Sequence, residues 1–154
     1  MEIRAARHGV FHTGAFMKKV PVLMLVAWAV FVSSWFLPVA SGGFLEPATV
    51  YYGWRAFLIA LRAPQWGDGW LFGILSICSG LSNGLMLLSG VLLLRRRPSQ
   101  WVPGWLTLGF VVAVAVDLVW VWLRAFLEVG YWLWLASFAL GAIALSRMRR
   151  RQAR

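Results

Sequence analysis

The residues of this chain that could take part in chemistry are few, and two of them lie inside long apolar stretches. Asp117 is the one acidic residue within such a stretch. Because a carboxyl group is expensive to bury in lipid, an acid at this depth is by default a candidate functional site. Two structural interpretations compete with that one, and together they are favoured. The carboxyl is protonated there, or it pairs with Arg124, seven residues further along the same helix face.

Asn83 lies near the middle of a second apolar stretch, among serines and glycines. Gly80 and Gly84 around it have the G-x-x-x-G spacing that lets two helix backbones approach closely, and an asparagine can hydrogen-bond across such a contact. The favoured interpretation is therefore the packing face of a helix bundle. The alternative is that Asn83 contacts a substrate.

Four polar residues are expected in the same half of the membrane, counting about 1.5 Å per residue from the ends of the apolar stretches. They are Ser33, Ser34, Asp117 and Ser137. If they face one another, they form a small polar cluster, and Arg55 or Arg62 caps it from the water side. The competing and favoured interpretation is that each serine bonds to a carbonyl group of its own helix.

Groups for enzyme catalysis or metal binding are scarce. Cys78 is the single cysteine, and the two histidines, His8 and His12, precede the first apolar stretch. The chain has no G-x-x-x-x-G-K-[ST], H-E-x-x-H or G-x-S-x-G motif. Since catalysis needs a positioned base or nucleophile, we expect no enzyme activity, no metal and no cofactor.

The composition predicts an integral membrane protein. Hydrophobic residues make up 61% of the 154 residues and charged residues 13%, with a mean hydropathy of +0.74. A soluble domain is about half apolar and about a quarter charged. The net charge of +10 does not indicate nucleic acid as a partner, because the charges lie beside the apolar stretches. There they orient the helices and attract anionic lipid headgroups.

Four apolar stretches are long enough to cross a bilayer, which takes about 20 residues. The expected spans are about 20–39, 70–94, 101–123 and 127–146, between basic tails at 1–19 and 147–154. A cleaved signal peptide is the alternative for the first stretch, and the length of that stretch disfavours it. Met17 directly before two lysines has the form of a translation start, so the natural chain is expected to begin there or at Met1.

The loop 40–69 is expected to carry a short helix that lies in the membrane interface. From Ala48 to Arg62 the pattern is amphipathic, too short and too charged to span, and rich in aromatic residues that favour headgroup depth. The residues that mark this interfacial helix are Tyr51, Trp54, Arg55 and Arg62.

Lysine and arginine are distributed unequally between the two sides of this arrangement. Twelve of the fifteen lie in the two tails and the 95–100 connection, and three (Arg55, Arg62 and Arg124) lie in the other connections. The positive-inside rule therefore predicts four spans with both termini cytoplasmic, in a bacterial inner (plasma) membrane.

Several short segments resemble a loose group of small bacterial four-span membrane proteins of unknown function. They are Ser34-Trp35-Phe36-Leu37-Pro38, Gly53-Trp54-Arg55-Ala56-Phe57, Ser82-Asn83-Gly84-Leu85-Met86 and the run from Gly130 to Ser137. The resemblance covers about 20–146 and implies the same topology, with no activity to transfer. A glycine follows Asn83 where that group has proline, so a kink there is not implied.

These observations predict an all-α integral membrane bundle of four transmembrane helices, with the interfacial helix between the first and second. The expected function is that of a non-enzymatic accessory or structural component, acting through helix contacts with a second copy or another membrane protein. The alternative is a small transporter or lipid-binding membrane protein that uses a polar cluster around Asp117 and Asn83. A membrane enzyme is the least favoured possibility.

Overall fold

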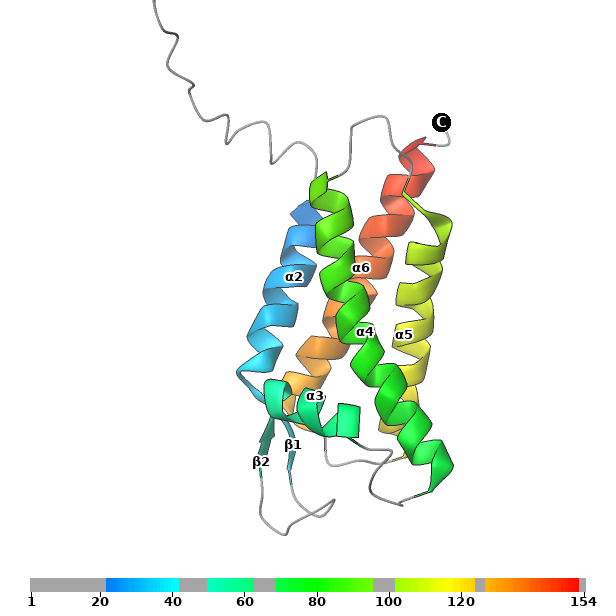
Figure 1. Cartoon of the computed structure of the whole chain (residues 1–154). Coiled ribbons are helices and arrows are strands. Elements are labelled where there is room, and N and C mark those ends of the chain that lie inside the picture. The colour runs from blue at the N-terminus through cyan, green and yellow to red at the C-terminus, as the bar shows by residue number, and fades with distance from the viewer. Residues whose placement is uncertain (1–21, 42–49, 63–68, 96–101, 124–126, 153–154) are drawn as a thin grey trace, which may run out of the picture.

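The computed structural model describes residues 22–41, 50–62, 69–95, 102–123 and 127–152. They form a bundle of long helices with a short helix and a two-stranded hairpin across one end (Figure 1). The elements in chain order are α2 (Val22–Trp35), β1 (Pro38–Ser41), β2 (Val50–Tyr52), α3 (Gly53–Arg62), α4 (Trp70–Arg95), α5 (Gly104–Trp122) and α6 (Val129–Gln152).

Three of these helices are long and apolar enough to cross a membrane. They include residues Gly73–Arg95 of α4, and all of α5 and α6. Helix α2 is apolar too, but its described part has only 14 residues. Length and composition thus support a helical, membrane-spanning chain with three candidate spans.

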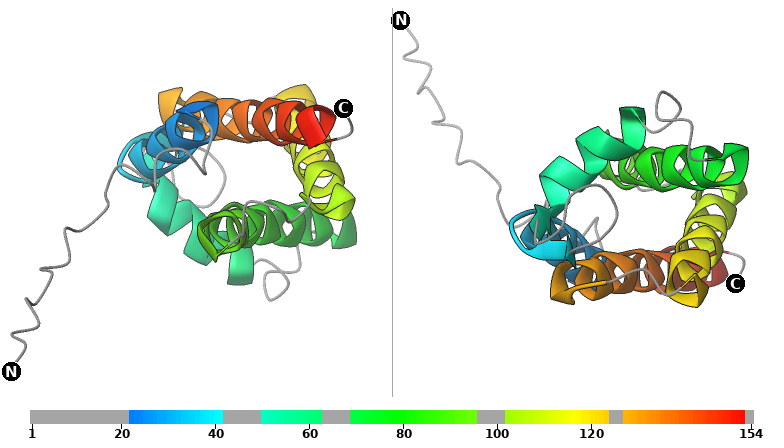
Figure 2. Two further views of the ribbon diagram at one scale, coloured as in Figure 1. Left: turned by 90° about the horizontal axis from the view of Figure 1, so that it is seen from above. Right: turned by 90° about the horizontal axis from the view of Figure 1, so that it is seen from below.

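The long helices pack in a ring rather than all against one another. Helix α2 packs on α6, α6 on α5 and α5 on α4, while α3 contacts both α2 and α4 (Figure 2). We call the end that carries α3 and the hairpin the cap end. The opposite end, where α4 and α6 finish in arginines, is called the basic end (Figure 1).

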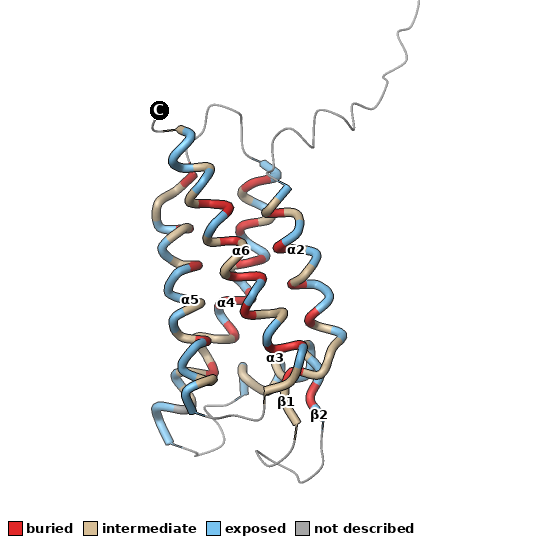
Figure 3. The backbone as a smooth tube through the Cα atoms, turned by 180° about the vertical axis from the view of Figure 1, so that it is seen from behind, coloured by how far each residue is buried: buried red, intermediate tan, exposed pale blue. Residues whose placement is uncertain are grey.

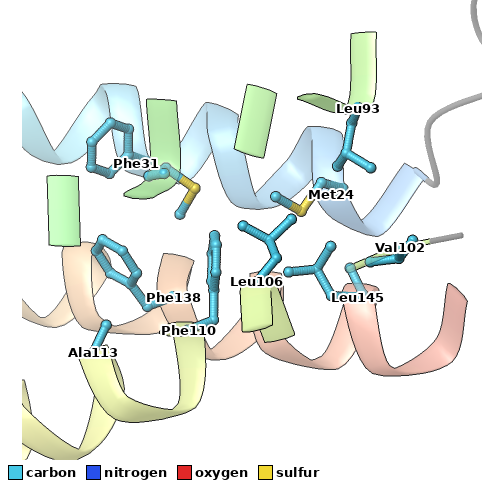
Figure 4. Packing of buried hydrophobic residues seen from close by; sticks show 11 residues of the cluster. Met24, Phe31, Leu93, Val102, Leu106, Phe110, Ala113, Phe138 and Leu145 are labelled. Carbon is cyan, nitrogen blue, oxygen red and sulfur yellow. The ribbon is translucent and has the colours of Figure 1, made fainter. Parts of the chain in front are cut away.

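The interior is apolar for most of the length of the bundle. One buried cluster, which we call the core cluster, draws on all four long helices (Figure 4): Met24, Phe31, Met86, Leu93, Val102, Leu106, Phe110, Ala113, Phe138, Ala144 and Leu145. Buried and exposed residues alternate along each of the four long helices (Figure 3). The exposed positions are also apolar, as Leu108 of α5 and Leu81 of α4 illustrate. An apolar exterior around an apolar core is the pattern of a bundle surrounded by lipid.

The hairpin at the cap end is tied to α6 by main-chain contacts. Strands β1 and β2 are antiparallel, with Ser41 opposite Val50. Ala40 also forms a bridge with Leu127, and the N–H of Glu128 donates to the main-chain oxygen of Val39 over 3.0 Å. These bonds join the chain after α2 to the start of α6.

The hairpin corrects two boundaries expected from the sequence. The first helix ends at Trp35 rather than near Val39, because residues from Pro38 onward pair as a strand, and a proline disfavours helix in the residue before it. The helix expected from Ala48 begins at Gly53 instead, because Val50–Tyr52 form β2. Tyr51 therefore belongs to a strand, and it is buried there.

The other helices lie close to their expected positions. Helix α4 matches its predicted span to within one residue, and α5 lies within 101–123. Helix α6 continues to Gln152, beyond the predicted end at 146, since arginine is a good helix former. The expected tail 1–19 lies outside the described residues, as do most of the 95–100 connection and parts of the loop 40–69.

Candidate functional site

Three helices contribute to a group of hydrogen-bonded side chains within the part of the bundle nearer the cap end. Each helix supplies two of them at a spacing of three or four residues, which places both on one helix face. We call this group the polar network: Ser79 and Asn83 of α4, Asp117 and Trp120 of α5, and Tyr131 and Trp134 of α6.

Asp117 is at the centre of the polar network and is fully buried, with 0% of its surface exposed. Its Oδ1 accepts a hydrogen bond from the Ser79 hydroxyl over 2.9 Å. The same hydroxyl oxygen accepts a hydrogen bond from the Trp120 Nε1–H over 3.0 Å. The serine thus carries one chain of hydrogen bonds from an indole to the carboxyl group, across the α4–α5 contact.

Asn83 connects α4 to α6 in the same way. Its Oδ1 accepts from the Trp134 Nε1–H over 2.9 Å, and its Nδ2 donates to the main-chain oxygen of Ser79 over 3.2 Å. The side-chain amide therefore joins a neighbouring helix to its own. This agrees with the interhelical interpretation of Asn83.

Tyr131 closes the network on the α5–α6 side. Its hydroxyl donates to the main-chain oxygen of Asp117. Its ring centroid lies 5.6 Å from that of Trp134. An aromatic side chain with a polar tip suits this position, because the ring packs in the apolar interior while the hydroxyl satisfies a carbonyl.

The second carboxyl oxygen of Asp117 is an exception to this pattern of satisfied groups. Oδ2 is buried and has no hydrogen-bond partner among the described residues. Arg124, the expected partner, lies outside them. Since buried polar atoms are nearly always paired, an orphaned carboxyl oxygen calls for an explanation such as a bound proton or ion.

Two apolar layers enclose the polar network. The core cluster packs on one side, and residues of the hairpin and α6 form a second buried cluster toward the cap end, with partly buried residues of α3 packed against it. We call this the cap cluster: Val39, Tyr51, Tyr131 and Leu135. Trp134 packs against both clusters, and Trp120 against the cap cluster. The carboxyl group is therefore occluded from both ends of the bundle.

The serines expected in a polar cluster do not join the network. Ser33 is exposed on α2. Ser34 and Ser137 are buried, but each donates over 2.6 Å to a carbonyl three residues earlier in its own helix, Phe31 and Trp134 respectively. Of the polar residues singled out from the sequence, Ser33, Ser34, Asn83, Asp117 and Ser137, the network thus contains Asp117 and Asn83.

The arginines of α3 do not cap the network. Arg55 and Arg62 are both exposed, and the Arg55 guanidinium lies 5.8 Å from the ring centroid of Tyr51. Trp54 is exposed as well. These residues line the outer side of α3, while Tyr51 packs beneath it in the cap cluster.

Sequence reasoning missed the partners that complete the network: Ser79, Trp120, Tyr131 and Trp134. Ser79 is one of several serines near Asn83, and the three aromatic residues belong to apolar runs that are rich in aromatic side chains, so their local pattern does not set them apart. One signal could have found them. An indole N–H within a span needs an acceptor, and only a few polar side chains are available there.

Trp134→Phe tests the α4–α6 link. The substitution keeps most of the ring packing but removes the N–H that Asn83 Oδ1 accepts. We expect the free energy of unfolding to fall by about 1 kcal/mol, measured by SDS titration in a mild detergent. Trp122→Phe is the control, because that ring is 81% exposed. Equal stability of the two variants would show that the bond contributes nothing.

Within the described ranges, no three residues among histidine, cysteine, aspartate and glutamate lie close enough together to hold a metal ion. Cys78 is a half-buried free thiol on α4.

A comparison of the chain with protein-family models, with curated proteins and with solved structures found no match in any of the three.

Proposed function

We propose that this chain is a four-span inner-membrane protein of bacteria that binds a proton or a small organic cation at Asp117 and acts as a small transporter. The observation that carries the proposal is the fully buried Asp117 carboxyl, whose Oδ2 lacks a partner among the described residues. This favours the alternative function raised by the sequence over a purely structural role.

The position of α2 supports a fourth span. Its 14 described residues rise about 21 Å at 1.5 Å each, and Val20 and Pro21 precede them in the sequence. Met24, Ala27 and Phe31 are buried in the bundle. Exposed Val22, Val26 and Val32 give α2 the same apolar exterior as the longer helices.

The distribution of arginines supports the orientation. Arg95 and the arginines of α6 lie at the basic end, and Arg55 and Arg62 lie near the cap end (Figure 1). Four spans with cytoplasmic termini place the first group inside, as the positive-inside rule requires.

The surroundings of Asp117 suit a cation. Among the described residues no cation pairs with the Asp117 carboxyl. A carboxylate without a counter-charge is costly to keep in a low-dielectric interior, and a bound proton or cation removes this cost. Trp120, Tyr131 and Trp134 bring aromatic rings into the same network, and the face of an aromatic ring attracts organic cations. One carboxylate holds a proton or a cation but not both, so binding of the cation releases the proton.

Proton release provides the test. Tetramethylammonium, a small organic cation, is added to the purified protein in weakly buffered detergent solution at several pH values, and the released protons are measured with a pH indicator. We expect the native chain to release a proton for each cation bound. Asp117→Asn should release none, because its side chain keeps the shape and the Ser79 contact without the ionisable group.

Glu128→Gln is the matched control, since Glu128 is the other described carboxylate and bonds to Ser41 outside the network. It should release protons as the native chain does. The proposal is wrong if the native chain releases no protons at any pH, or if Asp117→Asn releases as many as the native chain.

A role as an accessory protein remains the second candidate, and one glycine favours it. Gly84 lies exposed midway along α4, and a Cβ atom added there would meet nothing within 4 Å. Such a gap in a lipid-facing helix can receive a helix of a second chain. Purification in mild detergent as a strict monomer, with no accompanying membrane protein, would contradict this role.

A further inference from the structure

The last turns of α6 extend the helix past its apolar part at the basic end. They are held against the start of α5 by two contacts. Gln152 Oε1 accepts the main-chain N–H of Val102 over 3.0 Å. A Cβ atom built on Gly104 would lie 3.1 Å from Nη1 of Arg149, so this guanidinium lies directly on the glycine. One side of the extension is therefore fixed to α5.

The other side of the extension carries three exposed arginines. We call it the arginine face: Arg147, Arg150 and Arg151. Spacings of three and four residues place these side chains together on one face of the helix. Arg149 is exposed too, but its guanidinium lies on Gly104, and Gln152 bonds to Val102, so the arginine face is held in a defined direction by contacts that do not use it.

The charge of the arginine face is not balanced by any carboxylate that the structure describes. Asp117 is in the polar network, and Glu128 bonds to Ser41 at the cap end. These are the two acidic residues within the described ranges. Among the described residues the basic end has no counter-charge, so it can accept one from another source.

The exposed face of α6 suggests that source. Ile143 lies four residues before Arg147 on the same face and is 45% exposed. The exposed apolar side chain of Ile143 thus lies about one helical turn before the guanidinium groups of the arginine face. A molecule that matches both has an acyl chain and an anionic headgroup, and a guanidinium binds a phosphate oxygen pair in a bidentate manner.

We propose that the arginine face is a binding site for anionic phospholipid. The headgroup phosphate contacts Arg147, Arg150 and Arg151, and an acyl chain lies along Ile143. The site does not depend on Asp117, so it can be tested apart from the proposed transport function.

The test compares the native chain with the variant Arg147→Gln/Arg150→Gln/Arg151→Gln. Both are purified in mild detergent and titrated with phosphatidylglycerol, and lipid binding is followed by native mass spectrometry. Each arginine near a lipid surface changes affinity by about fivefold, so we expect the triple variant to bind roughly a hundredfold more weakly. Arg55→Gln/Arg62→Gln is the control from the cap end and should bind as the native chain does.

Two further arms make the result specific. Phosphatidylcholine should bind weakly to all variants, and glycerol phosphate, which has the headgroup charge but no acyl chain, should not compete with the lipid. The variant with lysine at all three positions keeps the charge but loses the bidentate geometry, so it should recover only part of the affinity. The proposal fails if the triple glutamine variant, folded by its circular dichroism spectrum, binds phosphatidylglycerol like the native chain. It also fails if glycerol phosphate displaces the lipid, or if the cap-end control loses as much affinity.

Discussion

Replacing Phe138 with alanine is expected to lower the free energy of unfolding by about 3–5 kcal/mol. The ring is fully buried on α6. Its centroid lies 6.1 Å from that of Phe31 on α2, 5.7 Å from that of Phe110 on α5 and 5.3 Å from that of Trp134. One side chain thus holds three helices together, and its removal leaves a cavity among rings that cannot all move inward.

The loss of stability expected for Phe138→Ala comes from lost packing contacts rather than from exposure of the site to water. Lipid chains are as apolar as the interior, so helices in a membrane associate mainly through close van der Waals contact. A missing ring removes many such contacts at once. The free energy can be measured by SDS titration, with tryptophan fluorescence as the signal.

Leu108→Ala is the matched control for Phe138→Ala. Leu108 is 63% exposed on α5, so its truncation removes contacts with lipid rather than with the bundle. We expect a change within about 0.5 kcal/mol. Equal losses for the two variants would mean that the core cluster does not hold the helices as described.

Gly130→Val is expected to separate the hairpin from α6. A Cβ atom at this position would lie 2.6 Å from the main-chain oxygen of Pro38 and 2.9 Å from that of Leu37. These are backbone atoms, which cannot turn aside as the end of a side chain can. Forcing extra atoms into such a contact costs about 1–3 kcal/mol.

The effect of Gly130→Val should concentrate at the cap end. The bond from the Glu128 N–H to Val39 and the bridge between Ala40 and Leu127 both lie beside the glycine. Hydrogen exchange should therefore become faster in β1 and in the first turn of α6, together with a lower unfolding temperature.

Gly84→Val is the control, because nothing lies within 4 Å of a Cβ atom there. It should leave both the unfolding temperature and the exchange of β1 nearly unchanged. If Gly130→Val behaves like this control, the close approach of β1 to α6 does not exist in the membrane.

Local features of the chain were predictable from residue order. The spans expected at 70–94 and 101–123 correspond to α4 and α5, and the amphipathic pattern before Arg62 does end in a helix, α3. These predictions succeed because an apolar run needs no partner to be recognised. The thickness of the bilayer sets the length of the run, and the polar groups of its backbone are satisfied by hydrogen bonds within the same helix.

The hairpin was not predictable in this way. The pattern of Val50–Tyr52 is compatible with a helix face, and the residues before Pro38 continue an apolar run. Strand pairing decided where α2 ends and where α3 begins, because Pro38–Ser41 pair with β2 and Ala40 bridges to Leu127. A short strand gains its hydrogen bonds only from a distant segment, so local propensity is a weak guide.

The residues alone determined that Asp117 and Asn83 are the unusual polar groups of an otherwise apolar chain. Only the tertiary structure decided which groups surround them. Ser79 and Asp117 are 38 positions apart, and Asn83 and Trp134 are 51 apart. Their meeting depends on which helices are neighbours and how each is rotated about its axis. Side-chain packing sets that rotation, because lipid surrounds every helix equally and favours no particular face except through its fit to a neighbour.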